Sequence, residues 1–66
     1  MTDRKVLKTK IERLDDDPKV WKIIEDCLDE GDANCLKVHS RLMDHYDGDN
    51  NPVNPLVWEV SDWLNS

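Results

Sequence analysis

The chain has 66 residues, of which 38% are apolar and 36% are charged, and its formal net charge is −6. A chain of this length forms one small domain whose single core leaves a narrow margin of stability, roughly 3–5 kcal/mol, and little room for a substrate cavity. No apolar run approaches the length of a membrane span, and residues 1–14 lack the apolar block of a signal peptide, so we expect a soluble, cytoplasmic protein without membrane contact.

The charges are distributed unevenly along the chain. Residues 1–14 carry five Lys or Arg against two acids, whereas residues 15–66 carry four against thirteen. This asymmetry predicts a basic first helix on an acidic body. An acidic body repels phosphate backbones, which disfavours direct nucleic-acid binding, and it attracts basic protein surfaces instead.

The apolar residues recur with the period of an α-helix, which predicts an all-α domain of three to four short helices. We expect one domain over residues 1–66, with a loop at 47–54, a central antiparallel hairpin, and helices at approximately 3–14, 18–30, 33–46 and 55–64.

The clearest helix is predicted over residues 18–30. Its first turn has a carboxylate cap at Asp17 and proline at Pro18, and Gly31 follows as the left-handed residue that ends a helix. One side of the helix gathers four residues, flanked by Ile23 and Trp21. These four are Val20, Ile24, Cys27 and Leu28.

The flanking helices have narrower apolar stripes. Over residues 3–14 the stripe is Leu7, Ile11 and Leu14, with Thr2 as the expected cap. Over residues 33–46 we expect Asp32 as the cap and a short connection that pairs this helix with the one before it. The central stripe of the 33–46 helix is predicted to be Cys35, His39, Leu42 and Tyr46, with Val38, Met43 and Leu36 at its margins.

The segment 47–54 is dense in turn-forming residues and is predicted to be a loop. It resembles a calcium loop only superficially, because Pro52 stands where glycine is needed and Trp58 stands where the bidentate Glu belongs. Asn54 and Pro55 then repeat a cap-and-proline start for the last helix. Its apolar face is predicted to be Leu56, Val57, Val60, Trp63 and Leu64.

Cys27, Cys35 and His39 are the residues with metal-ligand chemistry, since Cys35 and His39 are one helical turn apart. A fourth ligand is missing because His45 points away from this side. Buried free thiols are therefore the favoured interpretation over a disulfide or a zinc site, and we expect neither a metal nor another cofactor. No third group orients a Cys and His pair for catalysis, so we do not expect an enzyme.

Trp58 carries most of the functional information. It lies about 200° from Leu56, on the polar side of the last helix, so we expect it to be an exposed anchor for a protein partner. Its burial under the loop or the first helix is the alternative. The carboxylates predicted to accompany it in partner binding are Asp44, Asp47, Asp49, Glu59 and Asp62.

These features predict a small acidic protein-binding module that covers a basic surface of a larger nucleic-acid-handling protein. A sharper form is a phage-type inhibitor whose carboxylates imitate DNA phosphates. The first alternative is a self-associating homodimer that buries Trp58 and the first helix stripe. The second is nucleic-acid contact through the basic first helix.

Overall fold

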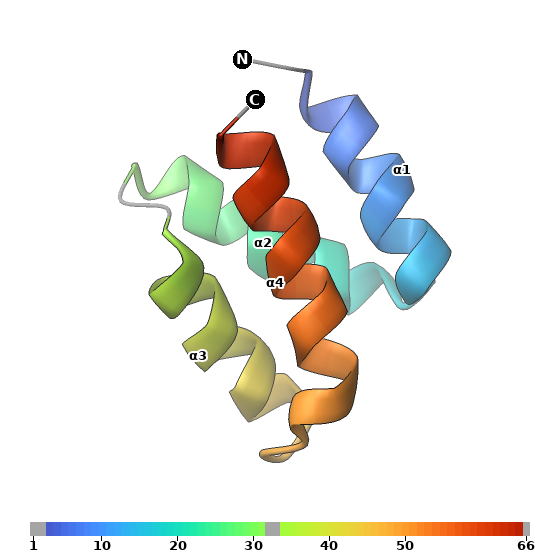
Figure 1. The fold of residues 1–66 in the computed structure, drawn as a ribbon, viewed down its shortest axis with the longest axis vertical. Helices are drawn as coiled ribbons and strands as arrows, with labels where there is room; N and C mark the ends of the chain where they lie inside the picture. The colour runs from blue at the N-terminus through green and yellow to red at the C-terminus, as the bar shows by residue number, and fades with distance from the viewer. Residues whose placement is uncertain (1–2, 32–33, 66) are drawn as a thin grey trace.

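The computed structural model describes residues 3–31 and 34–65, which form four helices and, within that range, no strand. The helices are α1 (Arg4–Leu14), α2 (Pro18–Asp29), α3 (Cys35–His45) and α4 (Asn50–Leu64) (Figure 1). The predicted all-α fold is confirmed. No helix in the described part of the chain is long and apolar enough to cross a membrane.

Helix α4 lies between α1 and α3 and packs against both (Figure 1). Helix α2 passes behind α4 in this view and contacts α1 and α3. All four helices contribute to one apolar core, which consists of Leu7, Ile11, Val20, Trp21, Ile24, Cys27, Leu28, Val38, Leu42, Val53, Leu56, Val60 and Trp63. The face predicted for residues 18–30 is therefore confirmed, with Trp21 buried at its margin.

A side-chain oxygen caps the N-terminus of each helix by accepting a hydrogen bond from an otherwise unpaired backbone amide. Asp17 caps α2 as predicted, and Gly31 has the expected left-handed backbone, with φ of 84°. Asp3 caps α1 and Asn34 caps α3. The caps expected at Thr2 and Asp32 lie outside the described residues.

The last helix begins earlier than predicted, so a loop over 47–54 followed by a helix from Pro55 is wrong. Asp49 is the N-cap of α4, and its carboxylate accepts a hydrogen bond from the amide of Asn51. Pro52 then lies in the first turn, where the backbone amides have no partner within the helix, so its missing amide hydrogen costs no helical hydrogen bond. Pro55 lies inside the helix, where the bond to the carbonyl four residues earlier is lost. The additional turn buries Val53.

Two predicted apolar stripes need correction. Leu14 was expected in the core with Leu7 and Ile11, but it is half-exposed, because it is the last residue of α1. In α3 the buried positions are Val38 and Leu42. His39, predicted for the centre of that stripe, is only half-buried at its margin.

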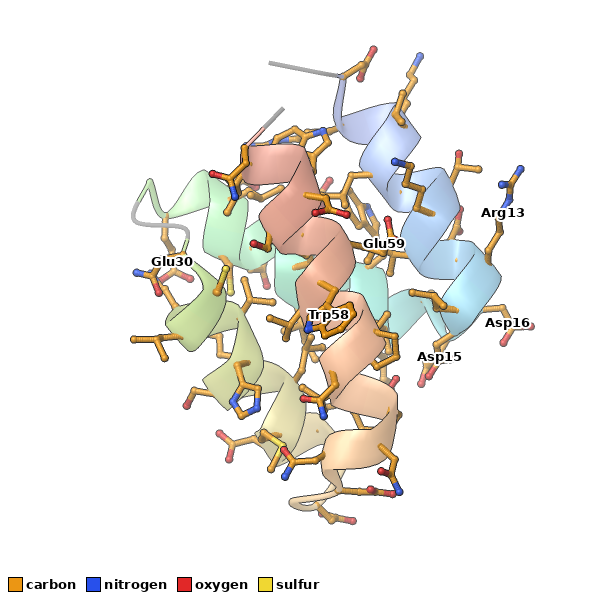
Figure 2. All side chains as sticks on the ribbon, viewed as in Figure 1. Arg13, Asp15, Asp16, Glu30, Trp58 and Glu59 are labelled. Atoms are coloured by element: carbon orange, nitrogen blue, oxygen red, sulfur yellow. The ribbon has the colours of Figure 1, made fainter. Side chains whose placement is uncertain are left out.

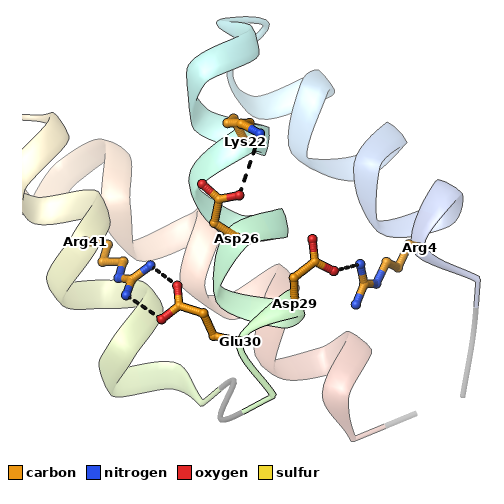
Figure 3. A network of polar contacts seen from close by, with 6 residues as sticks. All are labelled: Arg4, Lys22, Asp26, Asp29, Glu30 and Arg41. Carbon is orange, nitrogen blue, oxygen red and sulfur yellow. Dashed lines mark hydrogen bonds and ion pairs between the residues drawn. The ribbon is translucent and has the colours of Figure 1, made fainter.

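Ion pairs connect the helices at the surface (Figure 3). Arg4 of α1 contacts Asp29 of α2 at 2.6 Å. Glu30, just after α2, accepts two hydrogen bonds from the guanidinium of Arg41 in α3, at 2.5 and 2.8 Å, and its carboxylate is 3.1 Å from the ammonium of Lys37. These hydrogen bonds to the charged form lower the pKa of Glu30 to about 2.

Candidate protein-binding site

Trp58 is the exposed one of the three tryptophans. It is 75% exposed, whereas Trp21 and Trp63 retain only 9% and 8% of their accessible surface. In Figure 2 its ring lies over the middle of α4, on the broad face of the molecule. The prediction that this side chain points away from the core is confirmed, and the alternative in which the loop or the first helix covers it is wrong.

The phase of α4 explains this orientation. Leu56, Val60 and Trp63 face the core, and successive residues turn by about 100°. Trp58 therefore shares its side with the residues three and four positions away, which are Asn54, Pro55, Ser61 and Asp62. Three of these four are polar, and one of them is charged. The immediate surroundings of the ring are thus polar and only weakly acidic.

One shallow hollow borders the ring, and a second hollow shares one lining residue with it. The first, of about 250 Å³, is lined by Trp58, Ser61 and Asp62. The second, of about 360 Å³, lies between α1 and α4 and is also lined by Asp62. We call the whole area the Trp58 surface, defined by Lys10, Arg13, Leu14, Trp58, Glu59, Ser61 and Asp62.

The structure divides the predicted acidic residues into two groups. Glu59 and Asp62 belong to the Trp58 surface. Asp47 and Asp49 lie in the turn before α4, and Asp44 lies in α3. Asp49 precedes Trp58 by nine residues, which is about 13 Å along a helix axis, and its carboxylate already serves as the cap of α4. The acidic turn therefore forms a region separate from the ring.

Three residues of the Trp58 surface come from α1 and are not among the residues predicted to bind a partner protein. Lys10 and Arg13 of α1 line the second hollow together with half-exposed Leu14, and Glu59 and Asp62 of α4 complete its lining. None of the ion pairs within the described residues joins these cations to these carboxylates. Nothing in the sequence pattern relates positions 10–14 to positions 58–62, since only the packing of α1 on α4 brings them together.

The residues with metal-ligand chemistry are arranged differently from a ligand set. Cys27 and Cys35 are both free, Cys27 is fully buried and Cys35 is half-buried. Burial raises the pKa of the Cys27 thiol. Within residues 3–31 and 34–65, no three His, Cys, Asp or Glu side chains are grouped so that they could hold a metal ion. His39 is not brought together with the two thiols in any such group.

A second polar cluster lies where α3 ends beside the junction of α1 and α2. The hydroxyl of Tyr46 donates a hydrogen bond to the carboxylate of Asp15, and His45 lies 3.5 Å from Asp17. The hydrogen bond from Tyr46 lowers the pKa of Asp15, and burial together with this bond raises the pKa of Tyr46. Each of these groups is satisfied within the chain, so the cluster serves packing of the helices.

The Trp58 surface is therefore the part of the described structure best suited to contact another molecule: an exposed indole, a second apolar side chain and four unpaired charges around two shallow hollows. Comparison with known proteins adds no further constraint, because no protein-family model, no curated protein and no solved structure matches this chain.

Proposed function

We propose that this chain is a small protein-binding module that anchors itself to a larger protein through Trp58. The observation that carries the proposal is the 75% exposure of an indole on a domain whose core is complete without it. Tryptophan is enriched among the residues that dominate binding energy, since a large flat ring removes much apolar surface from water when it enters a pocket.

Charge favours a basic partner. The chain as a whole has a net charge of −6, although Lys10 and Arg13 balance the carboxylates of Glu59 and Asp62 within the Trp58 surface itself. The acidic turn with Asp47 and Asp49 adds negative charge at one end of α4. Such an arrangement accelerates encounter with a positively charged surface and orients it. A nucleic-acid-handling protein presents that kind of surface, and a chain bound there would act as an inhibitor.

The proposal is tested by affinity capture from an extract of the source cells with three immobilised baits: the natural chain, Trp58→Ala and Leu36→Ala. Leu36 is the matched control, because it is an apolar side chain with 83% exposure on α3. We expect one captured protein to be retained by the natural chain and by Leu36→Ala, and to be lost with Trp58→Ala.

The captured protein should be basic, and its retention should weaken as salt is raised, because exposed charges are screened beyond about 10 Å at 0.1 M salt. Competition by duplex DNA would support the narrower proposal of an inhibitor that occupies a DNA-binding surface. Equal capture by all three baits, with Trp58→Ala still folded by circular dichroism, would refute the anchor role.

A further inference from the structure

The Trp58 surface has a charge pattern that complements itself. We propose that, when no partner is bound, this surface takes a second copy of the chain in a two-fold symmetric dimer that covers Trp58. The inference rests on the proposed function, because it adds a means of closing the same binding site. Dimer formation and partner binding then exclude each other.

The first argument is local charge balance. The second hollow is lined by two cations, Lys10 and Arg13, and by two carboxylates, Glu59 and Asp62. These charges cancel, whereas the chain as a whole carries −6. Two copies repel each other because both are acidic, and this electrostatic repulsion is weakest where two balanced surfaces meet.

The second argument is the arrangement of those charges. The cations lie on α1 and the carboxylates on α4, and the two helices pack side by side (Figure 2). A two-fold axis in the plane of contact, running between the two helices, places α1 of one copy over α4 of the other. In such an isologous interface each contact occurs twice. Lys10 and Arg13 of each copy therefore face Glu59 and Asp62 of the other.

The third argument is size and apolar content. The molecule measures 31 × 24 × 17 Å, and Trp58 lies on the 31 × 24 Å face. The outline of that whole face, α3 included, is of the order of the ~800 Å² that each partner contributes to a stable interface, so the dimer must use most of the face. Trp58 and Leu14, at 75% and 48% exposure, are the large apolar side chains available there to be buried.

The test is sedimentation equilibrium of the full chain over a wide concentration range, with two charge reversals. Lys10→Glu/Arg13→Glu makes the chain more negative, and Glu59→Lys/Asp62→Lys makes it less negative. We expect each double variant to weaken self-association at least about tenfold, because like charges then face each other twice. General repulsion alone predicts the opposite result for Glu59→Lys/Asp62→Lys.

Mixing the two double variants provides the decisive measurement. Acidic α1 of one copy then faces basic α4 of the other, and the reverse contact is the natural one, so the heterodimer should form with an affinity close to that of the natural homodimer. Lys19→Glu/Lys22→Glu is the control, since it makes the same change in net charge on α2 as Lys10→Glu/Arg13→Glu makes on α1. This control should still dimerise.

The two proposals fail separately. A natural chain that stays monomeric at high concentration, or a mixture of the two double variants that does not associate, would overturn the dimer and leave Trp58-dependent capture of a partner untouched. A dimer that obeys the charge-reversal pattern, together with capture that is independent of Trp58, would keep the dimer and remove the proposed partner-binding function.

Discussion

Trp58 and Trp63 are five positions apart in α4 and have opposite environments. Trp63 is buried to 8% exposure, and its indole nitrogen donates a hydrogen bond to the backbone oxygen of Asp3 at 3.3 Å, so it joins the end of α4 to the start of α1. Trp58 is not part of the core, and its ring faces solvent. The same residue type thus stabilises the fold at one position and is available for binding at the other.

These two residues provide a matched test of whether Trp63 stabilises the fold while Trp58 does not. Trp63→Ala should lower the free energy of unfolding by about 3–5 kcal/mol, because a buried indole leaves a cavity, and a domain of this size then has little stability left. Trp58→Ala should change it by less than about 0.5 kcal/mol, as for other exposed positions. Urea unfolding followed by circular dichroism measures both, and a large loss of stability with Trp58→Ala would mean that the ring supports the fold.

The start of α4 differs from the predicted one because two residues compete as its N-cap. Asp49 and Asn54 are both capable N-caps, and each is followed within a few residues by proline. The structure uses Asp49, which adds a turn that carries Val53 into the core. Because the longer helix is the one that forms, we infer that burial of Val53 and the cap at Asp49 together offset the hydrogen bond lost at Pro55.

The position of the cap is directly testable. Asp49→Ala should destabilise the chain by about 1 kcal/mol, because it removes the acceptor for the amide of Asn51. Asn54→Ala should leave stability equal or slightly higher, since alanine is the better residue inside an exposed helical turn. Thermal or urea unfolding compares the two, and the reverse order would place the helix start at Asn54.

At the scale of the whole molecule, polar surface contacts connect α1, α2 and α3. Arg4 connects α1 to α2, Glu30 connects α2 to α3, and Tyr46 connects the end of α3 to Asp15 between α1 and α2 (Figure 3 shows the first two). Two of these contacts depend on carboxylates whose pKa values are lowered by folding, those of Glu30 and Asp15. Stability should therefore depend on pH in the acid range.

The direction in which stability changes with pH follows from the difference in the pKa of Glu30 between the folded and unfolded chain. Folding lowers the pKa of Glu30 from 4.5 to about 2, so its contribution is complete above pH 4.5 and disappears as the pH falls towards about 2. Glu30→Gln should be less stable than the natural chain at neutral pH and should lose less stability over this interval. Urea unfolding at a series of pH values gives both quantities. The same acid dependence in both chains would contradict a role for this carboxylate.

The sequence by itself determined that the domain is helical, where α2 begins, and that Trp58 points away from the apolar side of the last helix, but not where that helix begins. The helical period and the cap at Asp17 act over a few residues, and the phase of a helix places Trp58 opposite its apolar side whatever the neighbouring helices do. These are local properties, so they could be derived without knowledge of the fold.

Only the tertiary structure decided what surrounds Trp58. Lys10, Arg13 and Leu14 line a hollow that shares Asp62 with the hollow beside the ring, because α1 packs against α4, and the acidic turn with Asp47 lies away from the ring. Contacts between segments more than forty residues apart depend on how all four apolar faces are buried at once. No local pattern in the sequence specifies that arrangement, and it is the arrangement that makes the binding surface mixed in charge.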